Sequence, residues 1–297
     1  MNSSMCVIGP MAATAADLTI AYRIMAQPNP ADPAQNLLAV SVPPAPSAKK
    51  YLGLCHEWLA TADPAVQAVF SQTLAHLTSP QGGGYEAVDI HLPYLREAQI
   101  AHGATCLTES ALDARTRSPA HPLALLSAAN RLLIGAGAQT PAVDYLAYGR
   151  LRTAVMQHLA WLFARHPGLL VLTPATPMAG WPRGAGDEAH GFSDGNWSMR
   201  SMRFAWLANT SGCPAVSFPA GYVEAAQGEG VLPVGLMAMG EWGEEERLLG
   251  FARERERYLN EVYPGGRTRP EEWEDVIGLA REAAGKGVVE GEAVGEE

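Results

Sequence analysis

Hydrophobic residues recur along the chain with two different periods, which predict alternating helices and strands. Apolar positions near a 3.6-residue period, including Ala16, Ile20 and Ile24, predict a helix over 13–26. Residues 51–55 form an apolar run of strand length, Asp63-Pro64 then opens a second helix, and residues 85–92 form the next strand. A strand, a helix and a strand within about forty residues indicate a parallel pair joined by a crossover helix.

The second half of the chain continues this alternation around one strongly apolar segment. Residues 93–137 are predicted to be mostly helical, and Thr140-Pro141 begins a long helix that ends near Gly168. Leu169 to Thr173 is wholly apolar apart from its last residue, which is typical of a central strand buried on both faces. Further helices are expected over 197–209 and 243–262, and strands over 216–218 and 232–239. The predicted fold class is α/β, with a mixed, twisted central sheet covered by helices.

The composition and net charge of the chain limit the classes of partner that it is expected to bind. The chain has 297 residues, 47% of them hydrophobic, and a net charge of −10. Its arginines are scattered and only three residues are lysines, so no stripe could follow a phosphate backbone and nucleic acid is not an expected partner. No apolar run reaches the roughly 18–20 residues of a membrane span, and no signal peptide is evident. We therefore expect a cytoplasmic protein without a membrane span.

The same composition predicts one main domain and a distinct tail. Residues 1–262 carry the periodic pattern, whereas residues 264–297 contain nine acidic and only four basic residues and few large apolar ones. A segment of this kind buries too little apolar surface to offset the entropy of ordering, so 263–297 is predicted to be an acidic, flexible tail. The four cysteines are far apart without a Cys-x-x-Cys pair, and no metal site, disulfide or cofactor is expected.

Three short motifs match known catalytic or binding patterns but lack the required context. Gly191-Phe192-Ser193-Asp194-Gly195 fits a nucleophile elbow, yet the preceding residues are polar and rich in glycine and no histidine follows His190. Asp187-Glu188-Ala189-His190 resembles a helicase box without a phosphate-binding loop before it. Gly135-Ala136-Gly137 follows a helical pattern and is better explained as a helix C-terminus. An α/β-hydrolase using Ser193 remains an alternative.

Four segments in a fixed order resemble the amidase signature family of hydrolases. They are Leu169 to Pro177, Asn209 to Gly221, Leu232 to Gly240 and the acidic helix start Glu244-Glu245-Glu246; Val7-Ile8-Gly9-Pro10-Met11 with Asp17-Leu18 agrees with the family at the N-terminal end. The resemblance covers about 7–262 and begins in the middle of the family's domain. It implies an amidase signature fold that is incomplete at its N-terminal side.

The resemblance also implies amide hydrolysis by a serine nucleophile, a second serine that relays the proton, and a lysine base, without a cofactor. A lysine base needs burial and a lowered pKa, but Lys49 and Lys50 follow a proline-rich connector. Ser3-Ser4 lacks the flanking glycines that would supply an oxyanion hole. No catalytic residue can therefore be placed in this chain, and we expect an amidase-family hydrolase represented by its C-terminal part and inactive alone. The position of Leu169, where many relatives carry an aspartate, also departs from the family pattern.

The segments near the ends of the predicted strands supply candidates for a substrate pocket. Loops at the carboxyl ends of strands are where α/β proteins place ligands, and we expect the turn after Thr173-Pro174 and the loop Asn209–Pro214 to line one concavity. The pocket candidates are Thr173, Pro174, Trp181, Trp197, Trp206, Asn209 and Cys213. A completed protein would take a small-molecule amide, and an unpaired sheet edge could cause self-association. The main alternative is a non-catalytic, amidase-like binding or scaffold protein.

Overall fold

A five-stranded mixed sheet lies at the centre of the structure, a computed structural model that describes residues 4–31, 41–45, 49–124, 126–187, 194–268 and 279–280. Its strands are β1 (Tyr51–Leu54), β2 (Glu86–Asp89), β3 (Leu169–Pro174), β4 (Ala215–Glu224) and β5 (Val231–Met239), in the order β2-β1-β3-β5-β4. β1 is parallel to β2 and β3, whereas β5 is antiparallel to both β3 and β4. The predicted mixed sheet and the parallel first pair are confirmed.

β3 is the central strand, as its apolar sequence predicted. All six of its residues are buried, and Leu172 is 0% exposed. Because both neighbours of β3 are strands and both of its faces are covered, polar alternation is not needed along it. The buried β3 strand therefore holds in place the points at which its two flanking loops leave the sheet.

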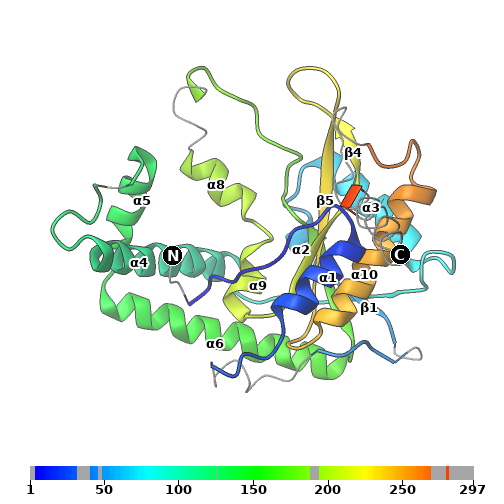
Figure 1. The fold of residues 1–297 in the computed structure, drawn as a ribbon, viewed down its shortest axis with the longest axis horizontal. Helices are drawn as coiled ribbons and strands as arrows, with labels where there is room; N and C mark the ends of the chain where they lie inside the picture. The colour runs from blue at the N-terminus through cyan, green and yellow to red at the C-terminus, as the bar shows by residue number, and fades with distance from the viewer. Residues whose placement is uncertain are drawn as a thin grey trace, which may run out of the picture.

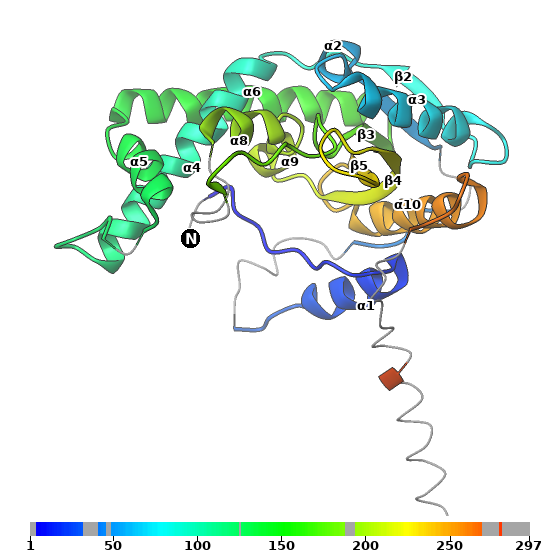
Figure 2. The same cartoon turned by 90° about the horizontal axis from the view of Figure 1, so that it is seen from above.

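Helices cover the sheet and also extend beyond it. They are α1 (Ala15–Met25), α2 (His56–Leu59), α3 (Pro64–Thr78), α4 (Leu95–Arg117), α5 (Ala128–Gly137), α6 (Ala142–Arg165), α8 (Gly195–Ser201), α9 (Trp206–Ser211), α10 (Glu245–Arg257) and the π-helix η2 (Tyr258–Val262). Figure 2 shows α3 on one side of β3–β5 and α10 on the other, with α1 outside α10. In Figure 1, α4, α5 and the first half of α6 form a helical arm that projects away from the sheet.

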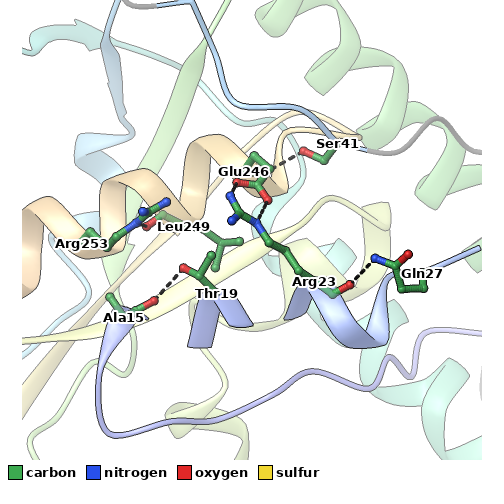
Figure 3. A network of polar contacts seen from close by, with 8 residues as sticks. All are labelled: Ala15, Thr19, Arg23, Gln27, Ser41, Glu246, Leu249 and Arg253. Carbon is green, nitrogen blue, oxygen red and sulfur yellow. Dashed lines mark hydrogen bonds and ion pairs between the residues drawn. The ribbon is translucent and has the colours of Figure 1, made fainter. Parts of the chain in front are cut away.

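α1 is held against α10 by polar contacts (Figure 3). The Arg23 guanidinium donates from Nε and Nη2 to the two carboxylate oxygens of Glu246 at 2.7 and 2.8 Å. The Glu246 backbone N–H in turn donates to Ser41 Oγ at 2.9 Å, and the Ala15 N–H donates to Glu256 at 3.0 Å. A bidentate Arg–carboxylate pair fixes the relative orientation of its two side chains as well as their distance, so α1 packs on α10 in one defined orientation.

Two predicted elements differ from those observed. The helix expected over 197–209 is two short helices, α8 and α9, separated by residues 202–205. The strand expected over 216–218 extends to Glu224 through a register shift between Pro219 and Gly221. Pro219 is compatible with the strand because β4 lies at the edge of the sheet, where a missing N–H costs least. The predicted tail lies mostly outside the described residues, although Thr268 N–H still donates to Tyr222 Oη at 2.9 Å.

Candidate functional site

A hollow of about 290 Å³ lies where the parallel strands β1 and β3 end. Leu54 ends β1 and Pro174 ends β3, and the remaining wall comes from α2, the α2–α3 turn and α3. The lining is Leu54, His56, Leu59, Ala60, Gln67, Phe70, Ser71, Leu74 and Pro174. It is mainly apolar with a few polar groups and without Lys, Arg, Asp or Glu, which is the usual character of a site for a neutral small molecule.

Two His–carboxylate pairs stand at this same edge of the sheet. His56 Nε2 lies 2.7 Å from Asp89 Oδ1, and His91 Nδ1 lies 3.1 Å from Glu57 Oε1. His56 and Glu57 directly follow β1, Asp89 is the last residue of β2 and His91 lies two residues beyond it, and all four side chains are more than half exposed. Sequence reasoning missed them: His56 and Glu57 directly follow the predicted strand 51–55, which was a usable signal, but Asp89 and His91 lie within the predicted strand 85–92. Among the described residues, no group of three or more His, Cys, Asp or Glu side chains could hold a metal ion.

An aromatic wall continues from the end of β3. The rings of Trp181 and Trp197 lie 6.1 Å apart at 66°, and the Arg200 guanidinium lies 5.3 Å from the centre of the Trp197 ring. Arg200 forms an ion pair with Asp63, whose backbone N–H donates to Pro177 O at 2.7 Å. These contacts attach the segment after β3 and α8 to the start of α3. Of the predicted pocket residues, Pro174, Trp181 and Trp197 are thus associated with this edge of the sheet.

Thr173 points into the protein core. It is 2% exposed, and its Oγ1 has no hydrogen-bond partner among the described residues. Successive residues of a strand face opposite sides, so Thr173 and Pro174 present different sides of β3. Thr173 is not among the residues that line the hollow.

Trp206, Asn209 and Cys213 are not among the residues that line the hollow. Trp206 is 1% exposed and packs 6.0 Å from the Trp58 ring, Asn209 donates to Met5 O at 2.8 Å, and Cys213 is 6% exposed. Burial raises the pKa of the Cys213 thiol to about 12, so this thiol is neutral at physiological pH. Their environments are those of core and anchoring residues.

The register shows that the turn after Pro174 and the loop Asn209–Pro214 lie at opposite ends of the sheet. β4 is parallel to β3, because both are antiparallel to β5. Pro174 is level with Leu236 and Phe218, whereas Ala215 begins β4 at the level of Met239 and Val171. A loop that enters a strand and a turn that leaves a parallel strand cannot share an end. The expectation of one concavity between them is therefore wrong.

Lys49, Lys50 and Ser4, the described residues among those considered as nucleophile or base, have other partners. Lys50 Nζ lies 2.9 Å from Glu254, and a hydrogen bond to Tyr51 raises the pKa of Lys49 rather than lowering it. Ser4 Oγ donates to Glu109 at 2.7 Å. Ser3 and Ser193 lie outside the described residues; Asp194, which follows Ser193, caps α8 by accepting from the Trp197 N–H. These contacts assign no catalytic serine or lysine.

The mixed sheet and its helical layers define an α/β protein with an apolar hollow at the ends of two parallel strands. The family model described as Amidase matches residues 1–249, and the chain belongs to this family. None of the described helices is long and apolar enough to cross a membrane.

Known proteins support this assignment. The chain is 28% identical to a glutamyl-tRNA(Gln) amidotransferase subunit of Thermus thermophilus over 84% of this chain and 55% of the relative. It is 26% identical to a fatty acid amide hydrolase of Medicago truncatula over 94% of this chain and 46% of the relative. The structure of the corresponding glutamyl-tRNA(Gln) amidotransferase subunit from Thermotoga maritima has the same fold, with a TM-score of 0.62 and 18% identity over 87% of this chain and 54% of that chain. The chain thus spans about half the length of these relatives.

Proposed function

We propose that this chain is the C-terminal part of an amide-hydrolysing enzyme and supplies one side of its substrate cleft. The observation that carries the proposal is the family match over residues 1–249, which includes every wall of the hollow at the ends of β1 and β3. By the family resemblance, a serine forms an acyl intermediate and expels the amine, and water then releases the acid. In this proposal, the serines and the lysine that perform these steps come from a part of the fold outside the described residues.

The proposed role of this chain is to bind and orient the substrate. The apolar lining from Leu59, Phe70 and Leu74 excludes water from the neutral part of an amide, while His56, Gln67 and Ser71 offer hydrogen bonds at the rim. Gln67 Nε2 already donates to Ala62 O at 2.7 Å, which holds its side chain in place. The Trp181–Trp197 pair, attached to the start of α3 through Arg200 and Asp63, would add a flat apolar surface for an acyl or aryl group.

The proposal predicts that the purified 297-residue chain neither hydrolyses simple aryl amides nor reacts with a serine-directed fluorophosphonate. Removing nucleophile and base leaves only binding effects, so turnover should stay at the background rate. The measurement is amine release together with mass spectrometry of the probe-treated chain. Stoichiometric labelling of one serine, with turnover that is lost when this serine is changed to alanine, would refute the proposal. Labelling at Ser193 would support the α/β-hydrolase alternative.

Two further results separate an enzyme part from a scaffold protein. A reading frame upstream that encodes a lysine-bearing strand and a glycine- and serine-rich stretch would make the complete product an enzyme, and the complete product should then release amine from aryl amides. A complete product that binds such amides without turning them over would favour the non-catalytic alternative.

A further inference from the structure

Cys106, in the helical arm, has a histidine beside its thiol. Cys106 and His102 lie four residues apart on α4, so their side chains are neighbours on the same face of the helix (Figure 1). Cys106 Sγ lies 3.7 Å from His102 Nε2. Cys106 is also partly exposed. This thiol therefore combines access to solvent with an imidazole in direct contact.

His102 is a buried, neutral imidazole. It is 9% exposed, and burial lowers the pKa of its ring below the ordinary value of 6.5. Among the residues that the structure describes, none is a hydrogen-bond partner of its Nδ1. A buried N–H without an acceptor is rarer in proteins than an acceptor without a donor, so the ring proton belongs on Nε2, the nitrogen that faces Cys106. His102 therefore donates an N–H to the sulfur.

This hydrogen bond makes the Cys106 sulfur a better nucleophile. An N–H donated to sulfur favours the thiolate over the thiol, and the thiolate is the reactive form. Cys106 lies in the middle of α4, beyond the reach of the positive end of the helix dipole, so the effect comes from His102. Glu109, three residues further on, would oppose a thiolate by its charge. Its carboxylate is held by Ser4 Oγ and Tyr145 Oη, which both donate to it at 2.7 Å and draw on its charge.

The two buried cysteines have the opposite environment. Cys55 and Cys213 are 2% and 6% exposed, and burial raises the pKa of both thiols. They are therefore shielded thiols. Cys6 is exposed and shows what access to solvent alone contributes to reactivity.

We propose that His102 activates Cys106 and that the pair forms a peroxide-reactive site on α4. The thiolate sulfur attacks one oxygen of hydrogen peroxide, so that an S–O bond forms and the O–O bond breaks. Hydroxide leaves and takes up the proton that the thiol lost, giving water. The sulfur is oxidised to a sulfenic acid and the peroxide is reduced. Neither residue lines the hollow at the ends of β1 and β3, so this inference stands or fails separately from the proposed function.

The test treats the full 297-residue chain with hydrogen peroxide in the presence of dimedone, which traps sulfenic acids, and follows each cysteine by peptide mass spectrometry. We expect Cys106 to be labelled about tenfold faster than the more exposed Cys6, and Cys55 and Cys213 to stay unlabelled. His102→Leu removes the N–H donor and should slow labelling at Cys106 about tenfold without changing Cys6. His102→Gln keeps a side-chain N–H and should restore most of the rate. The control His121→Leu, at an exposed histidine, should change no rate.

The buried cysteines report on folding in every variant, because unfolding would expose both of them to the reagent. If His102→Leu unfolds, His102→Met takes its place, since the flexible methionine side chain fills irregular space. Labelling of Cys6 as fast as Cys106 in the unmodified chain would overturn the proposal. An unchanged rate at Cys106 in a folded Leu or Met variant would do the same, and a folded Gln variant as slow as these would show that packing, and not the N–H donor, sets the rate.

Discussion

Gly82 lies in the turn that connects α3 to β2, directly against the backbone of His76. A Cβ atom added at Gly82 would stand 1.7 Å from the His76 carbonyl oxygen and 2.4 Å from its carbon. Both are backbone atoms, which cannot rotate away. The buried Arg255 also donates from Nη2 to Gly82 O at 2.9 Å, so the turn cannot shift without breaking this bond. Only glycine fits at position 82, because a Cβ atom would clash with the His76 backbone.

We therefore predict that Gly82→Ala lowers the free energy of unfolding by about 2 kcal/mol or more, the upper range for overpacked sites. Gly250→Ala is the control, because Gly250 lies within α10 and nothing stands within 4 Å of its added Cβ. There the gain in helix propensity should raise stability by about 0.5–1 kcal/mol. Denaturant unfolding of both variants measures the difference. Equal midpoints would show that the α3–β2 turn has more freedom than its contacts indicate.

At the scale of single residues, the sequence suggested which tryptophans could line a pocket, but it did not predict what surrounds each of them. Trp181 and Trp197 were predicted as pocket candidates and do form a pair. Trp206 was selected on the same grounds but is buried against Trp58. Whether a tryptophan faces a cleft or the core depends on which helix face meets the sheet, and this is set by tertiary packing. The His56–Asp89 contact joins residues 33 positions apart and has no local pattern at all.

The helix that the sequence predicted as continuous over 197–209 is interrupted at a backbone carbonyl that accepts hydrogen bonds from side chains. The indole N–H groups of Trp58 and Trp206 donate to Arg203 O at 3.0 and 3.1 Å. This carbonyl lies between α8 and α9, where the predicted helix over 197–209 is interrupted. Helical periodicity is unaffected by such a long-range bond from residue 58. Elements with strong end signals, such as Asp63-Pro64 before α3, were predicted at the correct residue.

The contact between α1 and α10 should depend on pH through Glu246. Hydrogen bonds from Arg23 lower the pKa of this buried carboxyl below its ordinary value of 4.5. The folded state therefore keeps Glu246 ionised at a pH where the unfolded chain takes up a proton. The stability from this group is present above pH 4.5 and is lost as the pH falls through the lower folded pKa.

We predict that Glu246→Gln lowers the melting temperature at pH 7 and reduces the loss of stability that occurs as the pH falls below the ordinary carboxyl pKa of 4.5. Glu229→Gln, in the exposed loop between β4 and β5, is the control and should leave both properties unchanged. Melting curves at several pH values measure the effect. An unaltered pH dependence in Glu246→Gln would mean that the ion pair does not contribute to folding.

At the scale of the whole molecule, the sequence predicted the layers and the central strand of the sheet. It did not predict which loops lie at the same end of the sheet. β3 was recognisable because a strand buried on both faces is apolar throughout, and the parallel β1–β2 pair followed from its crossover helix. Strand direction beyond that point depends on β5, which reverses the sheet and separates Pro174 from the Asn209–Pro214 loop. The relative direction of β3 and β4, which are separated by β5, cannot be predicted from the local preferences of their residues. A site assembled from several strand ends is therefore predicted less well than its individual strands.

The two edges of the sheet differ in their protection against pairing with another chain. β2 is four residues long and carries Glu86 and Asp89, whereas β4 is ten residues long and its alternate residues Ala215, Ser217 and Pro219 are exposed without charge. Short, charged edge strands resist edge-to-edge pairing, and long uncharged ones permit it. Among the described strands, β5 alone pairs with β4. Self-association of the isolated chain is therefore expected at the Ala215–Pro219 part of β4, because the Tyr222 N–H further along this strand already donates to Tyr263 Oη.

We predict that the purified chain forms concentration-dependent oligomers and that Ser217→Lys reduces them several-fold, because a lysine on an edge strand must lose its hydration when a second strand approaches. Leu132→Lys on α5 introduces the same charge change away from the sheet and should leave the oligomers unchanged. Sedimentation velocity over a range of concentrations measures the association. If both lysine variants reduce it equally, net charge and not the β4 edge controls the association. If neither does, the association does not use the β4 edge.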